Sequence, residues 1–241
     1  MSHSLFISDL HLSPERPRIV ETFFGFLTQT AARAESLYIL GDLFEYWIGD
    51  DDLAYPFNAV IAGALHEVAR GGVPLYFMHG NRDFLAARGF CDATGAVLLD
   101  DPTVIELGGE KTLLMHGDTL CTDDLDYPAW RRTARSAGFQ RGFLAKSIAE
   151  RRQAVLGMRE KSRQVVEAKP AEIMDVNAAA VRDAFRKHNV RRLIHGHTHR
   201  SAFHKVEVNG ARCERWVLPD WYGDGGGYLT VDEMGARLVS F

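Results

Sequence analysis

Five short apolar runs in this chain each break into Asp, His or Asn, in four cases beside glycine. The run at 192–194 leads into His197 and His199, which are separated by a single residue. The other runs, at 5–7, 37–40, 75–78 and 113–115, lead into Ser8-Asp9-Leu10-His11, Gly41-Asp42, His79-Gly80-Asn81-Arg82-Asp83 and His116-Gly117-Asp118. Alternate residues of an extended chain share a face, so we expect His197 and His199 to point into one site. One such motif is equally well explained as a capped turn, whereas five together indicate a ligand site at the carboxyl ends of strands in an α/β sheet.

The segments between these motifs alternate between helix-like and strand-like patterns. Apolar residues at helical spacing predict helices at about 18–34, 57–70 and 176–188. Alternating patterns around Gly108-Gly109 and Asn209-Gly210 predict hairpins, which join 103–107 to 111–115 and 202–208 to 212–218, and 227–241 is again strand-like. The stretch from about 120 to 169 is mostly helical and interrupts the sheet. We therefore predict one α/β domain over 1–241, with a largely parallel core and an inserted helical lid at about 120–169.

Basic residues are concentrated in the predicted lid. Between Trp130 and Lys169 there are eleven Lys and Arg against three Glu, a net charge of +8 in a chain whose formal charge is −4. Phe139, Phe143 and Leu144 alternate with these basic residues. A segment that exposes both kinds of side chain can meet an anionic substrate or a bilayer surface. The alternative is an ordinary lid whose apolar side chains pack inward and whose basic face is solvated.

Neither the hydropathy nor the cysteines indicate a membrane-embedded or disulfide-bonded protein. No apolar stretch approaches the roughly 18 residues of a membrane-spanning helix. We therefore expect a protein of the cytosol. Cys91, Cys121 and Cys213 lack the spacing of a metal site, and we expect reduced thiols. No separate nucleic-acid-binding segment is recognisable, so nucleic acid is not an expected partner.

The strand-end motifs together supply seven candidate metal ligands with oxygen or nitrogen donors. These are Asp9, His11, Asp42, Asn81, His116, His197 and His199. Seven ligands exceed the needs of one ion, but they form two shells with open positions if one carboxylate bridges two ions. Such a set suits Mn²⁺, Fe²⁺, Zn²⁺ or Co²⁺. A pair of ions about 3.5–4 Å apart clamps a phosphoryl group and neutralises its charge during an in-line displacement.

The same five motifs, in this order, resemble the five sequence blocks of the calcineurin-like metallophosphoesterases. The resemblance implies a four-layer αββα sandwich in which Asp42 bridges two ions. It assigns one ion to Asp9, His11 and His199, and the other to Asn81, His116 and His197.

The sequence departs from this family at Arg82, where the family usually has a histidine that donates a proton or contacts the transition state. Arginine cannot act as a general acid at ordinary pH. It can grip phosphate oxygens in a bidentate manner. Arg82 therefore favours a substrate whose leaving group is already a good one, such as the phosphate end of a pyrophosphate.

A closer resemblance, which spans nearly the whole chain, is to the bacterial UDP-2,3-diacylglucosamine diphosphatases. It is carried by six blocks, at 6–12, 38–45, 47–51, 78–84, 116–124 and 173–177. The resemblance implies hydrolysis of UDP-2,3-diacylglucosamine to UMP and 2,3-diacylglucosamine 1-phosphate in lipid A synthesis. It further implies attack by water at the α-phosphorus and two Mn²⁺ ions per chain. We expect a monomer that works in the cytoplasm, bound peripherally to the inner membrane from which it draws a lipid-linked nucleotide.

The same resemblance implies roles for individual residues. The catalytic residues would be Asn81, Arg82 and His116, and the substrate contacts would be Asn81, Arg82, Asp124, Ser162, Lys169 and His197. The family usually has Asn at the position of Val166, so one headgroup contact is in question. We expect Asp83, Asp118 and His195 to support the ligands, whereas the role of His79 stays open. Two alternative functions are a phosphoesterase for soluble nucleotides and a scaffold on a decayed site; the presence of all seven ligands argues against the scaffold.

Overall fold

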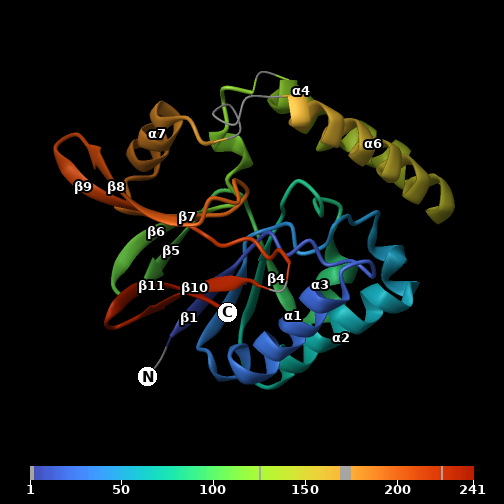
Figure 1. Ribbon diagram of the computed structural model, residues 1–241, viewed down its shortest axis with the longest axis horizontal. Coiled ribbons are helices and arrows are strands. Elements are labelled where there is room, and N and C mark those ends of the chain that lie inside the picture. The colour runs from blue at the N-terminus through green and yellow to red at the C-terminus, as the bar shows by residue number, and fades with distance from the viewer. Residues whose placement is uncertain (1–2, 125, 169–174, 224) are drawn as a thin grey trace.

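The computed structural model describes residues 3–124, 126–168, 175–223 and 225–241. Within these residues two β-sheets pack face to face, and helices cover their outer faces (Figure 1). One sheet has the strand order β11-β10-β1-β2-β3-β4 and the other has β5-β6-β7-β9-β8. The strands are β1 Ser4–Ile7, β2 Ser36–Ile39, β3 Leu75–Met78, β4 Ala96–Leu99, β5 Thr103–Leu107, β6 Glu110–Met115, β7 Arg192–His195, β8 Ala202–Val208, β9 Ala211–Val217, β10 Gly227–Asp232 and β11 Gly235–Ser240.

The first sheet is parallel from β1 to β4 and is buried on both faces. Leu5 and Ile7 of β1 pack beneath helices, whereas Phe6 between them packs against the second sheet. The helices on this side are α1 Pro17–Gln29, α2 Pro56–Arg70 and α3 Arg88–Thr94. Proline occupies the first turn of both α1 and α2, where its missing N–H costs no intrahelical hydrogen bond.

The second sheet alternates in the same way along its central strands. Leu114 of β6 and Ile194 of β7 pack with Phe6 between the two sheets. Their neighbours Leu113 and Leu193 face outward and pack against α7, Ala178–His188. The layers therefore run α, β, β, α, which confirms the predicted sandwich.

Both predicted hairpins form, but two short elements were not predicted. Leu107 pairs with Glu110 across the first turn, and Asn209 and Gly210 take positive φ values in the second. The elements absent from the sequence-based prediction are α3 and β4. The helix α3 has only seven residues, and β4 is a half-exposed edge strand, so neither carries a clear apolar period.

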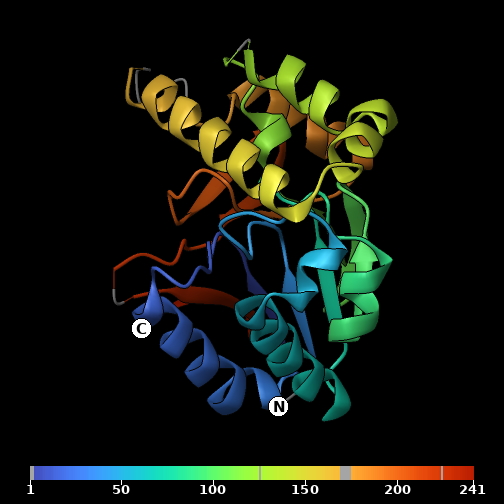
Figure 2. The same cartoon turned by 90° about the vertical axis from the view of Figure 1, so that its right-hand side faces the viewer.

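Three helices form the cap where the sequence predicted a helical insertion, α4 Asp126–Ala134, α5 Ala137–Leu144 and α6 Ile148–Ala168. They lie together above the sandwich (Figure 2). Phe143 is buried against the core, Phe139 is partly buried, and Leu144 is 41% exposed. Some apolar side chains of the cap therefore pack inward, as in an ordinary lid, whereas others are exposed, as in a segment that meets a substrate or a bilayer. Within the described part of the chain, no helix combines the length and the apolar character that crossing a bilayer requires.

Candidate metal centre

Most of the predicted ligands stand in left-handed turns just beyond the strand ends. The φ angle is positive at Asp9 (56°), His11 (49°), Asp42 (54°), His197 (70°) and His199 (55°). Such values are uncommon outside glycine, although Asp and His tolerate them better than most residues. Strained backbone of this kind persists where the surrounding structure holds it, and it gathers at functional sites.

The two histidines of the 197–199 motif belong to opposite halves of the site. The ring of His197 lies 5.0 Å from that of His116, and the ring of His199 lies 5.3 Å from that of His11. The strand β7 already ends at residue 195, and the backbone beyond it is left-handed rather than extended. Tight turns, rather than the strand alternation on which the expectation rested, therefore aim the two side chains.

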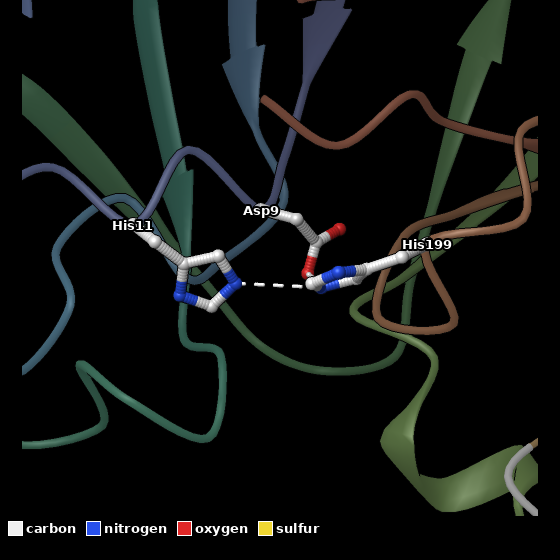
Figure 3. A group of neighbouring side chains, drawn as sticks. All are labelled: Asp9, His11 and His199. Carbon is white, nitrogen blue, oxygen red and sulfur yellow. Dashed lines mark hydrogen bonds and ion pairs between the residues drawn. The ribbon is translucent and has the colours of Figure 1, made fainter. Parts of the chain in front are cut away.

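Asp9, His11 and His199 form the first half of the site (Figure 3). The Nε2 atoms of His11 and His199 are 3.3 Å apart, and Asp9 Oδ1 is 3.4 Å from Nε2 of His199. Asp9 Oδ2 accepts hydrogen bonds from Ser8 Oγ and from the amide of His197, whereas the buried Oδ1 accepts none from the residues that the structure describes. Two imidazole nitrogens and an unpartnered carboxylate oxygen that converge in this way are a suitable donor set for a divalent cation.

Asp42 lies between this cluster and the second half of the site. Its Oδ2 is 3.9 Å from Nε2 of His11, and its Oδ1 is 3.8 Å from Nε2 of His116. The carboxylate is buried, and the amide of Arg82 donates to Oδ1 at 2.9 Å. Donor atoms of Asp9, Asp42 and His116 also come within 4.8 Å of one another. A carboxylate with a histidine on either side has the placement that a bridging ligand needs.

The second half is built around His116, which is fully buried. Its Nδ1 lies 2.8 Å from the carbonyl oxygen of Leu40, and its Nε2 lies 3.1 Å from Oδ1 of Asn81. When Nδ1 donates to the carbonyl, the lone pair of Nε2 points into the site, as it does in histidines that bind metals. His116, Asn81 and His197 therefore lie together.

Burial keeps two of the ligand histidines neutral. It lowers the pKa of His11 to about 3, with His199 adding to the effect. It lowers the pKa of His197 to about 4, with His116 adding to the effect. Neutral imidazoles offer a lone pair at neutral pH, so both side chains are ready to bind a cation.

The centre of the site attracts positive charge. Burial lowers the pKa of His116, but the carboxylates of Asp42, Asp118 and Asp9 outweigh it and raise the value to about 9. Burial raises the pKa of Asp42 to about 7. Buried acids that draw a proton onto a neighbouring imidazole mark a position that a cation satisfies. The donor set and the charge at this position therefore both fit a divalent metal.

Two glycines allow the ligand loops to close on one another. A Cβ atom at Gly80 would overlap the carboxylate of Asp42. A Cβ atom at Gly196 would overlap the side chains of Ser8 and Asp9. The close approach of Asp9 is therefore the constraint that requires glycine at position 196.

Arg82 presents an unsatisfied donor at the site. Its amide binds Asp42, and its carbonyl accepts from the amide of Trp47 at 2.9 Å, so the backbone is fixed. The Nε atom of the guanidinium is buried, and no described residue forms a hydrogen bond with it. A phosphate oxygen is a suitable acceptor for such a donor.

Of the predicted headgroup contacts Asp124, Ser162 and Lys169, only Asp124 has a side chain among the described residues. Asp124 accepts hydrogen bonds from the amides of Asp126 and Tyr127 at 3.2 and 3.3 Å, at the start of α4. Lys169 and the side chains of Ser162 and Val166 lie outside the described residues. The structure therefore brings together the seven candidate ligands and Arg82. It shows Asp124 bound to the first backbone amides of α4.

The supporting residues are bonded within the protein. Oxygens of Asp83 accept from the amides of Gly80 and Leu43, both at 2.8 Å. His79, whose role was open, lies 2.6 Å from the carbonyl oxygen of Ala86. Asp118 accepts from Tyr127 and Arg131, and the buried His195 contacts the carbonyl of Gly196. These contacts hold the loops that carry the predicted ligands.

Three acidic residues that were not assigned a role adjoin predicted ligands. Asp220 Oδ2 is 3.4 Å from Nδ1 of His199, and Glu45 Oε2 is 3.7 Å from Nδ1 of His11. Asp101 accepts from the amide of His116 at 3.4 Å. Only Glu45 offered a signal in the sequence, because it follows Asp42 closely. The other two come from distant loops that tertiary packing brings to the site.

Comparison with known protein families first identifies the class of protein to which this chain belongs. The family model for the calcineurin-like phosphoesterases matches residues 3–201. The chain belongs to this family.

Comparison with individual proteins identifies a narrower group within this family. A UDP-2,3-diacylglucosamine hydrolase of Aromatoleum aromaticum is 47% identical, over 98% of this chain and 96% of the relative. A protein of the same name from Pseudomonas paraeruginosa is 49% identical over 98% of both chains. Another, from Yersinia pseudotuberculosis, is 48% identical over 99% of this chain and 98% of the relative. Within the phosphoesterases the chain groups with these hydrolases.

Proposed function

We propose that this chain hydrolyses the pyrophosphate bond of UDP-2,3-diacylglucosamine, with water attacking the α-phosphorus. The products would be UMP and 2,3-diacylglucosamine 1-phosphate (lipid X), an intermediate of lipid A synthesis. The observation that carries this proposal is the identity of 47–49%, over 98–99% of the chain, with relatives named for this substrate. The phosphoesterase family and the clustered ligands support hydrolysis at phosphorus.

We further propose that two Mn²⁺ ions bind per chain. One would be held by Asp9, His11 and His199, the other by Asn81, His116 and His197, with Asp42 between them. When bound, such ions polarise phosphoryl oxygens and activate water at neutral pH. The converging atoms of Asp9, His11 and His199 support the first position, and the contact between His116 and Asn81 supports the second. Four imidazoles in the set favour Mn²⁺ over Mg²⁺, which prefers oxygen ligands.

Arg82 would bind the phosphate oxygens on which negative charge grows during the reaction. Its buried and unpartnered Nε supports this role. Because a guanidinium does not release a proton at ordinary pH, Arg82 would not protonate a leaving group. The bond that breaks must therefore expel a stable anion, as a pyrophosphate does and a simple alkyl phosphate does not.

We also propose that the cap meets the lipid part of the substrate at the inner-membrane surface. Large apolar side chains are exposed on its helices, namely Trp130, Leu144, Leu156 and Met158. Four arginines of the cap form ion pairs with carboxylates outside the cap, namely Arg131, Arg151, Arg152 and Arg159. Part of the basic charge of the cap is therefore neutralised within the protein. Apolar insertion is therefore expected to contribute more than surface charge to membrane contact.

Mass spectrometry of the products formed in ¹⁸O-labelled water tests the proposed reaction. UDP-2,3-diacylglucosamine dispersed in detergent should yield UMP that carries one ¹⁸O atom and an unlabelled lipid phosphate. Label in the lipid phosphate would place the attack on the other phosphorus. Turnover of a soluble sugar nucleotide without turnover of the lipid would contradict the proposed substrate.

A further inference from the structure

An arginine of the cap binds the turn that carries His116. Nε of Arg131 donates to Asp118 Oδ2 at 2.6 Å, and its Nη2 donates to Asp101 Oδ2 at 3.2 Å. Asp118 lies two residues beyond His116, and the other oxygen of Asp101 accepts from the amide of His116 at 3.4 Å. The hydroxyl of Tyr127, one helical turn before Arg131 in α4, donates to the same oxygen of Asp118 at 2.6 Å. Arg131 thus joins the two carboxylates that enclose the turn.

A second arginine of the cap reaches His11 in a similar way. Arg159 of α6 forms an ion pair with Oε1 of Glu45. The other oxygen of that carboxylate, Oε2, lies 3.7 Å from Nδ1 of His11. Among the described residues, this buried Nδ1 has no hydrogen-bond partner. A carboxylate beside the outward nitrogen of a histidine is the usual arrangement around histidines that bind metals, where it sets the orientation of the ring.

We propose that Arg131 and Arg159 are positioning residues, through which the cap sets the metal-binding geometry of His116 and His11. The inference rests on the proposed metal centre and goes beyond it, because it makes the cap a structural part of that centre. The arginines bind neither metal nor substrate in this role. Arg131 holds Asp118 and Asp101, of which Asp101 binds the backbone amide of His116, and Arg159 holds Glu45 beside the imidazole of His11.

Burial makes these pairs sensitive to the loss of one partner. The side chains of Asp118 and Asp101 are 0% and 4% exposed, and that of Glu45 is 15% exposed. Without Arg131, two enclosed carboxylates would face each other beside His116, and the turn would have to rearrange to separate or hydrate them. Without Arg159, Glu45 would lose the group that holds it towards His11.

The cap also contains an ion pair that serves as a control. Nη2 of Arg152 in α6 binds Oδ1 of Asp52 at 2.8 Å, and the other oxygen of Asp52 accepts from Asn58. This pair ties the cap to the core in the same manner, but within the described part of the chain its hydrogen bonds involve none of the predicted ligands. If attachment of the cap were all that mattered, Arg152→Met would act like the other two substitutions.

Calorimetric titration of the chelator-treated, full-length protein with MnCl₂, without substrate, tests the proposal. We expect Arg131→Met and Arg159→Met each to weaken Mn²⁺ binding by about 10- to 100-fold, the range found when the partners of metal ligands are removed. Arg152→Met should stay within about twofold of the wild-type protein. At limiting Mn²⁺ the first two variants should show a lower kcat with an almost unchanged KM, and excess Mn²⁺ should restore kcat.

The conservative variants Arg131→Lys and Arg159→Lys cover the case in which the Met variants do not fold. A lysine at 131 keeps the charge but loses the planar fork that spans two carboxylates, so it should give an intermediate affinity. Wild-type Mn²⁺ affinity in the variants at 131 and 159 would overturn the proposal, and so would an equal loss in Arg152→Met. Because metal binding is measured without substrate, a failure to hydrolyse the lipid nucleotide would contradict the proposed function alone.

Discussion

At the scale of single residues, the proposed chemistry depends on a buried carboxylate between two histidines. We expect Asp42→Ala to lower kcat by about 10³-fold or more, which corresponds to about 4 kcal/mol of lost transition-state stabilisation. The reason is that the oxygens of Asp42 face His11 on one side and His116 on the other. Steady-state kinetics and metal analysis in Mn²⁺-replete buffer provide the measurement. His66→Ala, on the exposed face of α2, is the control, and wild-type turnover of Asp42→Ala would disprove the assignment.

A buried histidine outside the ligand set makes acid stability testable. Burial lowers the pKa of His195 to about 3, with Arg215 adding to the effect, against about 6.5 in an unfolded chain. Below pH 6.5 the unfolded state therefore binds a proton that the folded state does not, and stability falls as the pH falls from 6.5 towards 3. The slope reaches up to about 1.4 kcal/mol per pH unit.

The variant His195→Gln isolates this contribution, because the variant and the wild-type protein have all other titrating groups in common. We expect the free energy of unfolding of the wild-type protein to decline relative to the variant as the pH falls from 7.5 to 5. Urea unfolding of the metal-free proteins at several pH values measures the difference. A difference that does not change with pH would show that folding leaves the pKa of His195 at its unfolded value.

At the scale of elements, what the sequence predicts depends on how regular each element is. The helices α1 and α2 and both hairpins have clear periods or turn residues, and they were predictable. The elements α3 and β4 are too short and too exposed to carry a period. The ligands followed from the motifs at the strand ends, whereas the arginines and carboxylates behind them depend on how the cap docks, which no local pattern encodes.

The cap offers a matched pair of tests for its membrane role. Leu144 and Leu156 are 41% and 50% exposed, whereas Phe143 is buried at 5%. We expect Leu144→Ser with Leu156→Ser to raise the KM for the lipid and to weaken binding to anionic vesicles, without loss of stability or metal. Phe143→Ala should instead cost about 3–5 kcal/mol of stability, because it leaves a cavity. Vesicle sedimentation, kinetics and thermal unfolding distinguish the two variants. Unchanged lipid kinetics in the double variant would show that the exposed leucines do not contribute to binding of the lipid.

At the scale of the whole molecule, the candidate metal centre joins the two sheets. Asp9, Asp42 and Asn81 follow β1, β2 and β3 of one sheet, while His116 and the 197–199 motif follow β6 and β7 of the other. Each proposed ion would therefore draw ligands from both halves of the sandwich. The site exists only when the two sheets are packed, which is why no segment of the chain could form it alone.

Metal removal should abolish activity, and the identity of the returned ion should matter. We expect Mn²⁺ to restore the chelated protein more fully than Mg²⁺, because four imidazoles in the proposed set suit a softer cation. Initial rates after addition of each ion to the chelator-treated protein are the measurement. Equal activity with Mg²⁺, in buffer freed of transition metals, would count against the proposed preference.

Metal removal should also loosen the packing of one sheet on the other. An ion that binds only the folded chain stabilises it by about 2.7 kcal/mol when its concentration is 100 times its Kd. Because the proposed ligands span both sheets, we expect this stabilisation to act on the global unfolding of the sandwich rather than on a single loop. Thermal unfolding should then stay a single transition whose midpoint rises with added Mn²⁺. A midpoint that is independent of Mn²⁺, or an ion effect confined to local hydrogen exchange in the 197–199 loop, would show that the metal does not join the two halves.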